Sequence, residues 1–169
     1  MHILTFDIED WFHILDNEET GSPSSWNNFE SRIIEGINRI LELLDRTDQN
    51  ATFFCLGWIA EKYPEAIKKI SDLGYEIGSH SFNHQLVYNQ SSKTFSIDLS
   101  RSIESIEQIT GKKVRIFRAP GFSITNNSLW AFDILSELGI EIDCSIFPAA
   151  RAHGGFPDFE NGPNRIITL

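Results

Sequence analysis

Two six-residue stretches of this 169-residue chain follow the same pattern, and that pattern restricts the fold. Residues 72–77 (Asp-Leu-Gly-Tyr-Glu-Ile) and 137–142 (Glu-Leu-Gly-Ile-Glu-Ile) each resemble the end of a helix, a glycine that stops it, and a short strand. Compact apolar runs and helix-like stretches also alternate along the rest of the chain. This alternation favours repeated strand–helix units around a parallel sheet or barrel.

The spacing of apolar residues places the individual elements. Helices are predicted where apolar residues recur every three or four positions: residues 29–46, a stretch from near Pro64 to Gly74, residues 94–110 and residues 127–138. Strands are predicted at compact apolar runs: residues 3–6, 51–55, 75–77, 114–117 and 140–142. Residues 11–28 are rich in serine, with a glycine and a proline, and are predicted to form a long surface loop.

Composition limits the partners. A length of 169 residues, 41% hydrophobic and 22% charged, predicts one globular domain over residues 1–169. The net charge of −10 argues against nucleic acid or an anionic membrane as partner and favours a neutral or cationic substrate. Without a leader-like start or an apolar run of about 18 residues, no membrane span and a cytoplasmic location are expected. Cys55 and Cys144 lie among apolar residues and are expected to be reduced.

Polar side chains follow the predicted strands at their carboxyl ends. They are Asp7, Glu9 and Asp10 after the first strand, His80 and His84 after the third, Arg118 after the fourth and Asp143 after the fifth. Because the carboxyl ends of parallel strands meet on one side of an α/β fold, we expect these groups to converge.

The two histidines indicate what such a cluster would do. His80 and His84 are four residues apart, so on a helical or turn-like backbone both imidazoles can face one metal ion. Two imidazoles and one carboxylate make a three-ligand site for Zn²⁺ or a similar divalent ion, with room for a water whose pKa the ion lowers. A second carboxylate can then act as general base, and Arg118 can keep that carboxylate ionised. There are two alternatives without a metal site. The histidine pair can lack such partners, and Asp7 and Arg118 can form an ordinary surface ion pair.

Several separate motifs occur in an order that resembles a known family, the polysaccharide deacetylases with a NodB homology domain (carbohydrate esterase family 4). The motifs are Thr5-Phe6-Asp7, Ala51-Thr52-Phe53-Phe54, His80-x-x-x-His84, Phe117-Arg118-Ala119-Pro120-Gly121 and Asp143-Cys144-Ser145-Ile146-Phe147-Pro148. The first motif, Asp-Ile-Glu-Asp-Trp-Phe, is similar to a subgroup found in bacterial exopolysaccharide and surface-glycan loci. The resemblance implies a deformed parallel (β/α) barrel.

The resemblance also implies roles for individual residues. Asp7 would be the general base, His80 and His84 metal ligands, Arg118 the residue that orients Asp7, and the Gly121 N–H the oxyanion donor. Asp143 and Ser145 would support the site. The family's usual second aspartate falls at Ile8, so the third ligand would be Glu9 or Asp10. Glu9 is slightly favoured because it lies two residues beyond Asp7, on the same face of an extended strand.

The implied activity is removal of an acetyl group, N-linked rather than O-linked, from a sugar of a glycan or of its precursor, with zinc as the expected ion. The family's general acid comes from a Leu-x-His motif, which this chain lacks up to Leu169, so His153 and His13 are the candidates. Residues 165–169 resemble an interrupted strand. The barrel is therefore expected to be incomplete at its C-terminal end, with an open sheet edge that favours a homodimer.

Two other functions stay open at this point. A catalytically silent glycan-binding module would keep the barrel and the loop aromatics Trp11, Phe12, Trp26 and Phe122. A hydrolase of a non-sugar amide on the same fold is the other alternative.

Overall fold

Five parallel strands form one sheet in the computed structural model, which describes residues 3–160 and 162–166. The strands are β1 (Thr5–Ile8), β2 (Thr52–Cys55), β3 (Glu76–Ser79), β4 (Ile116–Phe117) and β5 (Ile142–Asp143). They lie side by side in the order of the sequence, β1-β2-β3-β4-β5, and every pairing is parallel. The predicted parallel α/β architecture is confirmed.

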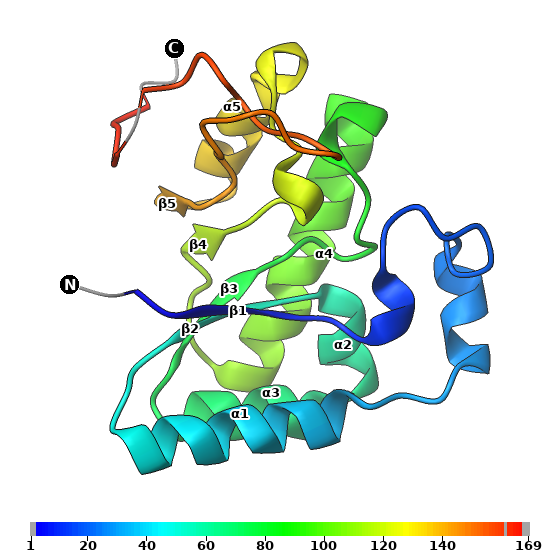
Figure 1. Cartoon of the computed structure of the whole chain (residues 1–169), viewed down its shortest axis with the longest axis vertical. Coiled ribbons are helices and arrows are strands. Elements are labelled where there is room, and N and C mark those ends of the chain that lie inside the picture. The colour runs from blue at the N-terminus through cyan, green and yellow to red at the C-terminus, as the bar shows by residue number, and fades with distance from the viewer. Residues whose placement is uncertain (1–2, 161, 167–169) are drawn as a thin grey trace.

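Helices follow the strands and cover one face of the sheet (Figure 1). They are α1 (Ile33–Thr47), α2 (Gly57–Lys62), α3 (Pro64–Asp72), α4 (Ser92–Thr110) and α5 (Trp130–Glu137). In Figure 1, α1 and α3 lie along the lower edge of the molecule, and the long α4 runs behind the sheet. Residues from these helices and from β2 and β4 share one buried apolar cluster. None of the described helices combines the length and apolar character that crossing a membrane requires.

The sheet curls, and an ion pair shows it. Three strand spacings separate β1 from β4, which in a flat sheet is about 14 Å. Nevertheless Arg118 Nη1, just after β4, lies 2.8 Å from Asp7 Oδ1 in β1. The guanidinium also lies over the ring of Phe54, with 4.2 Å between Arg118 Cζ and the ring centroid. The face opposite the helices is therefore concave and carries polar groups, as in the wall of a barrel.

Several predicted boundaries move. The helix expected near Pro64 is preceded by a separate helix, α2, and the chain bends between them at Tyr63 (φ −132°, ψ 58°). The bend arises because proline disfavours the helical conformation of the residue before it. The last helix begins at Trp130 rather than at residue 127, after a 3₁₀ turn (Asn126–Ser128). Of the strand predicted at residues 165–169, the first two residues are irregular and residues 167–169 lie outside the described residues.

One glycine sets how closely β3 approaches β4. A Cβ on Gly78 would lie 2.7 Å from the carbonyl oxygen of Ile116 and 3.0 Å from Cδ1 of Phe54. The nearest of these atoms belongs to backbone, which cannot turn aside as a flexible side chain can. Gly78 therefore lets β3 lie against β4 just before the histidine segment begins.

We expect Gly78→Ala to lower the free energy of unfolding by about 1–3 kcal/mol, because the added methyl group forces the two strands apart. Gly36→Ala is the matched control: among the described residues nothing lies within 4 Å of the added Cβ in α1, and a helical glycine replaced by alanine should gain about 0.5–1 kcal/mol. Urea unfolding of both variants measures the difference. Equal stability of Gly78→Ala and the parent would contradict the close approach.

Candidate metal centre

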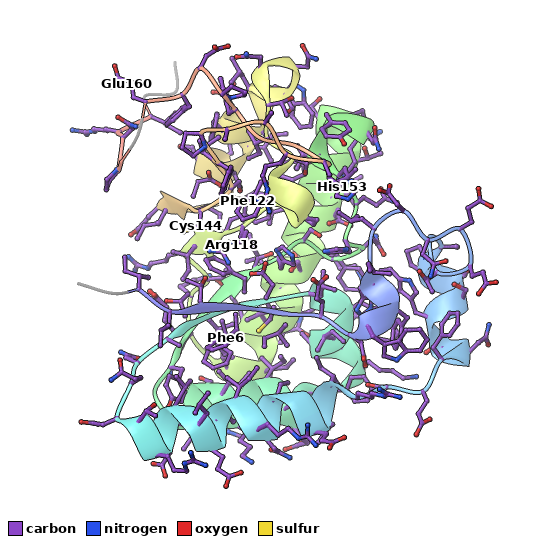
Figure 2. The ribbon with its side chains drawn as sticks, in the orientation of Figure 1. Phe6, Arg118, Phe122, Cys144, His153 and Glu160 are labelled. Carbon is purple, nitrogen blue, oxygen red and sulfur yellow. The ribbon has the colours of Figure 1, made fainter. Side chains whose placement is uncertain are left out.

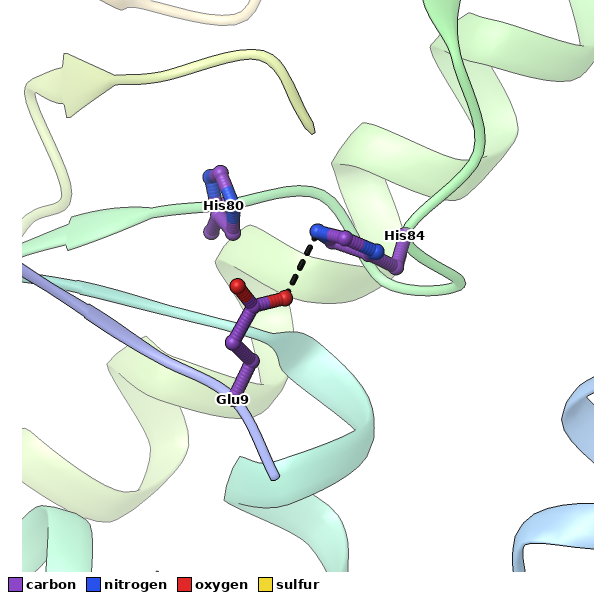
Figure 3. Close-up of side chains that lie close together, drawn as sticks. All are labelled: Glu9, His80 and His84. Atoms are coloured by element: carbon purple, nitrogen blue, oxygen red, sulfur yellow. Dashed lines mark ion pairs between the residues drawn. The ribbon is translucent and has the colours of Figure 1, made fainter. Parts of the chain in front are cut away.

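Three side chains offer ligand atoms that all lie within 4.8 Å of one another: Glu9, His80 and His84 (Figure 3). Glu9 comes just after β1, and the histidines come from the segment after β3. Both histidines are buried, and Glu9 is half-buried. The described residues thus bring together two imidazoles and a carboxylate, as the strand-end argument predicts.

The histidine segment is an irregular turn, so the turn-like alternative applies rather than a helix. Ser81 and His84 adopt left-handed φ values of 68° and 53°. The turn is held from α4, where the carboxylate of Asp98 accepts hydrogen bonds from the N–H groups of Phe82 (2.7 Å) and Asn83 (3.0 Å). It also accepts one from the Asn83 side-chain amide at 2.8 Å. Asp98 is a buried residue that our sequence reasoning missed; the available signal was a carboxylate on the apolar face of the helix predicted at residues 94–110.

The two imidazoles differ in their outer contacts. His80 Nδ1 lies 2.7 Å from the carbonyl oxygen of Arg118, which fixes Nδ1 as the donor and leaves the Nε2 lone pair free. Burial lowers the pKa of His80, although the nearby Asp7 opposes this, so the ring is kept in the neutral form that binds metal. His84 Nε2 lies 2.7 Å from Glu9 Oε2, while its Nδ1 has no hydrogen-bond partner among the described residues.

Of the two candidate third ligands, the geometry favours Glu9. Side chains alternate along an extended strand, so Glu9 faces the same side as Asp7 while Asp10 faces the other. Both carboxylate oxygens of Asp10 already accept hydrogen bonds, from the N–H groups of Trp11 (2.9 Å) and Arg32 (2.9 Å) and from the Ser31 hydroxyl. Asp10 therefore ties the turn after β1 to the segment before α1 and does not join the histidines.

The three residues fit a divalent ion. Glu9 Oε2 and His84 Nε2 are close but not oriented for a hydrogen bond, and Glu9 Oε2 is buried without a partner among the described residues. A buried, unpaired polar atom costs about 1–3 kcal/mol, so its retention calls for a reason. Two nitrogens and one carboxylate oxygen form a ligand set typical of catalytic zinc sites.

Asp7 lies beside this cluster rather than within it. Arg118 Nη1 donates to Asp7 Oδ1 at 2.8 Å and to Thr5 Oγ1 at 3.0 Å. The second carboxylate oxygen, Oδ2, is 3.9 Å from His80 Nε2. One oxygen of Asp7 is therefore occupied by a cation, and the other faces the space next to the candidate ligands.

Gly121 sits where only glycine fits. Its φ is 62°, and an added Cβ would lie 2.9 Å from both His153 Cβ and Leu86 Cδ2. The preceding backbone is held by Ser145, whose hydroxyl accepts the Ala119 N–H at 2.8 Å. Asp143 in turn accepts hydrogen bonds from the Ser145 hydroxyl and N–H, and burial raises the pKa of Asp143 to about 6. The role of Gly121 as an oxyanion donor stays a prediction.

The candidate general acids lie in different surroundings. His153 packs over Gly121, its side chain is 28% exposed, and its Nε2 lies 3.3 Å from Asp16 Oδ2. In the view of Figure 2, His153 and Phe122 lie above Arg118. His13 is 2% exposed, and burial lowers its pKa to about 3, so it carries no ionisable proton to give near neutral pH. Between the two, His153 is better suited to donate a proton.

The loop aromatics are not all available to a ligand. Phe12 and Trp26 are buried at 1% and 3% exposure, and both rings pack against His13. Trp11 is half exposed, and Phe122 is partly exposed beside Phe147. The expected set of four binding aromatics therefore reduces to these last two.

The lowered pKa of His13 predicts a pH dependence of stability. In the unfolded chain His13 binds a proton near pH 6.5, but in the folded chain only near pH 3, so the stability present above pH 6.5 is lost as the pH falls towards 3. The loss in the free energy of unfolding amounts to about 3 kcal/mol at pH 4. Chemical unfolding at pH 7, 5.5 and 4, with a chelator present, should show a flatter profile for His13→Asn than for the parent. Identical slopes would show that His13 is not buried as a neutral ring.

Comparisons with known proteins agree with this geometry. The sequence pattern of the polysaccharide deacetylase family matches residues 17–142, which include His80, His84 and Arg118 and follow Asp7 and Glu9. A peptidoglycan deacetylase of Helicobacter pylori is 29% identical over 139 residues, covering 82% of this chain and 46% of the relative. A peptidoglycan-N-acetylglucosamine deacetylase of Bacillus cereus is 30% identical over 122 residues, covering 65% and 44%. The chain thus spans about half the length of these curated relatives.

Solved structures share the fold. A Bacillus anthracis pseudoenzyme of carbohydrate esterase family 4 superposes with a TM-score of 0.63 at 26% identity, covering 83% of this chain and 41% of that one. A mutant of a pseudoenzyme of this family with restored enzymatic activity has a TM-score of 0.63 at 27% identity, covering 83% and 43%. A Mycobacterium smegmatis protein of the polysaccharide deacetylase type reaches 0.73 at 24% identity, covering 91% and 56%, a likeness of fold alone.

Proposed function

This chain belongs to the polysaccharide deacetylase family, and from that premise we propose that it is a metal-dependent hydrolase that removes the acetyl group from an N-acetylated sugar of a glycan or of its precursor. The observation that carries the proposal is the convergence of Glu9, His80 and His84, with Asp7 beside them and held by Arg118. These groups come from separate strand ends, and the fold brings them to one place.

The candidate metal ligands and the proposed general base have different roles in the reaction. Glu9, His80 and His84 would hold a divalent ion, with zinc as the expected ion, and that ion would supply a water of lowered pKa and polarise the acyl carbonyl. Asp7 takes a proton from the attacking water through Oδ2, because Oδ1 is engaged by Arg118 at 2.8 Å. The guanidinium keeps Asp7 ionised and oriented for this step.

The reaction then completes as follows. The water oxygen bonds to the acetyl carbon, and the Gly121 N–H stabilises the developing oxyanion, a donor of a kind worth about 3–4 kcal/mol in tests by deletion. The C–N bond breaks, the sugar amine leaves with a proton, and acetate is released. His153, which packs over Gly121 beside Asp16, is the proposed donor of that proton.

We expect Asp7→Asn to lower the rate of acetate release by about 10²–10⁴-fold, since an amide cannot accept the proton of the water. N-acetylated oligosaccharides, peptidoglycan fragments and nucleotide-linked amino sugars are the substrates to assay. Asp72→Asn, which removes an exposed carboxylate paired with Lys68 on α3, is the matched control and should retain the parent rate. Undiminished acetate release by Asp7→Asn would remove Asp7 from the role of base.

Metal content should separate Glu9 from Asp10. Elemental analysis after equilibration with zinc should give about one ion per chain for the parent, and little for His80→Ala and His84→Ala, since each loses one of three ligands. Glu9→Gln should bind zinc more weakly, whereas Asp10→Asn should keep its zinc although it loses stability. Unchanged metal content in both histidine variants would refute the metal centre, and loss of zinc only in Asp10→Asn would reverse the assignment of the carboxylate.

A catalytically silent glycan-binding module is the second candidate, because one of the similar solved structures is that of a pseudoenzyme. It predicts sugar binding without acetate release. The retained Asp7, His80, His84 and Arg118, and their convergence, support the hydrolase instead.

A further inference from the structure

Phe82 lies at the middle of the turn that joins the two candidate histidine ligands, and its side chain is 2% exposed. Its ring meets both α2 and α4, two helices that pack against each other. A Cβ on Gly57, at the start of α2, would lie only 2.5 Å from Cδ2 of Phe82. From α4, the guanidinium of Arg101 lies over the face of the ring, with 3.7 Å between Arg101 Cζ and the ring centroid. A residue of each helix therefore contacts the ring.

The backbone of Phe82 is bound from the same two helices. Its carbonyl oxygen accepts the N–H of Trp58 in α2 at 3.3 Å, and its own N–H donates to Asp98 in α4 at 2.7 Å. Asp98 and Arg101 are three residues apart, so they lie on the same face of α4. Neighbouring positions of one helix thus hold the backbone of Phe82 and cover its ring.

Arg101 is itself fixed by an acidic side chain of α2. Its Nε donates to Glu61 Oε1 at 3.0 Å, and its Nη2 donates to Glu61 Oε2 at 2.8 Å. A two-point contact of this kind fixes the plane of the guanidinium as well as its position. The two side chains are 55% and 44% exposed, and an exposed ion pair contributes little to stability by itself. What the pair does provide is a flat cation held against the ring of Phe82.

The position of this ring bears on the ligands because the turn is strained on both sides of it. Ser81 and His84 have left-handed φ values of 68° and 53°, a conformation that persists only when the surroundings hold it. The centroids of the His80 and His84 rings are 5.2 Å apart, and relaxation of the turn would change this spacing. Any population of a relaxed turn lowers the apparent affinity for an ion that needs both rings.

We propose that Arg101 is a positioning residue of the metal centre, which holds the histidine turn in its metal-binding conformation by covering the ring of Phe82. The inference rests on the proposed function only in taking Glu9, His80 and His84 as the ligands. It assigns to a half-exposed side chain on a helix a role in metal affinity that it exerts through Phe82. The alternative is that Arg101 and Glu61 form a surface ion pair without influence on the ligands.

The zinc affinity of the folded protein, measured by competition with a chromophoric chelator, tests this proposal. Arg101→Gln keeps a polar side chain on the helix surface but removes the flat cation. It should weaken zinc binding by about 5–30-fold, towards the lower end of the effect of removing a group that contacts a ligand directly. Arg39→Gln is the matched control, since it removes the exposed pair of Arg39 with Glu35 on α1 and should keep the parent affinity.

A second substitution shows whether Arg101 acts through the ring. Phe82→Leu keeps an apolar side chain in the buried space but removes the aromatic face. In that background Arg101→Gln should weaken zinc binding by less than about twofold, because the contact between the two residues is already lost. A role of Arg101 in stability alone would lower the urea midpoint and leave the zinc affinity of the folded protein unchanged.

If Phe82→Leu fails to fold, the NMR signals of the His80 and His84 rings in metal-free protein replace it. These signals should shift in Arg101→Gln and stay in place in Arg39→Gln, and unmoved signals in Arg101→Gln overturn the proposal.

Three results of the zinc titration would also overturn it: parent affinity in Arg101→Gln, an undiminished effect of Arg101→Gln in the Phe82→Leu background, or no zinc binding by the parent. Zinc binding with the expected pattern in a protein that releases no acetate would refute the hydrolase and leave the role of Arg101 standing. Acetate release by a zinc-loaded protein whose affinity does not depend on Arg101 would do the reverse.

Discussion

The carboxylate of Asp98 is the contact that anchors the histidine turn of the candidate metal centre. It is buried on α4 and accepts three N–H groups from Phe82 and Asn83, between the two histidines. Burial raises its pKa, and these hydrogen bonds partly compensate. The left-handed residues Ser81 and His84 each cost about 1–3 kcal/mol, a strain that Asp98 helps the turn to hold by anchoring its backbone. A residue of helix α4 thus positions the candidate ligands His80 and His84, which follow strand β3.

Arg118 positions side chains across the sheet, from β4 to β1. Its carbonyl oxygen contacts His80, and its guanidinium contacts Asp7, Thr5 and the ring of Phe54. One residue therefore orients the candidate metal ligand His80 with its backbone and the proposed base Asp7 with its side chain. Because it joins β4 to β1, the relative placement of the ligands and the base depends on the curvature of the whole sheet. A change in that curvature would separate them even if every residue were retained.

The outer contacts of the two candidate histidine ligands, His80 and His84, are unequal. His80 Nδ1 donates to the Arg118 carbonyl oxygen, whereas His84 Nδ1 and His13 Nε2 have no partner among the described residues. Together with Glu9 Oε2, these nitrogens form a group of buried polar atoms without a partner among the described residues, close to the candidate ligands.

The sequence by itself determined the parallel order of strands and helices, and it singled out Asp7, Glu9, His80, His84 and Arg118, because short apolar runs and the polar residues at their ends are local patterns. It left Glu9 and Asp10 as alternatives, and it contained no explicit sign of what Asp98 and His13 contact. Those were decided by tertiary structure. Hydrogen bonds between residues far apart in the chain occupied Asp10 and anchored the histidine turn, and the rings of Trp26 and Trp58 packed against His13 and buried it as a neutral ring. Spacing along a chain fixes which face a side chain takes, but only packing decides which partners are within reach and which donors remain unpaired.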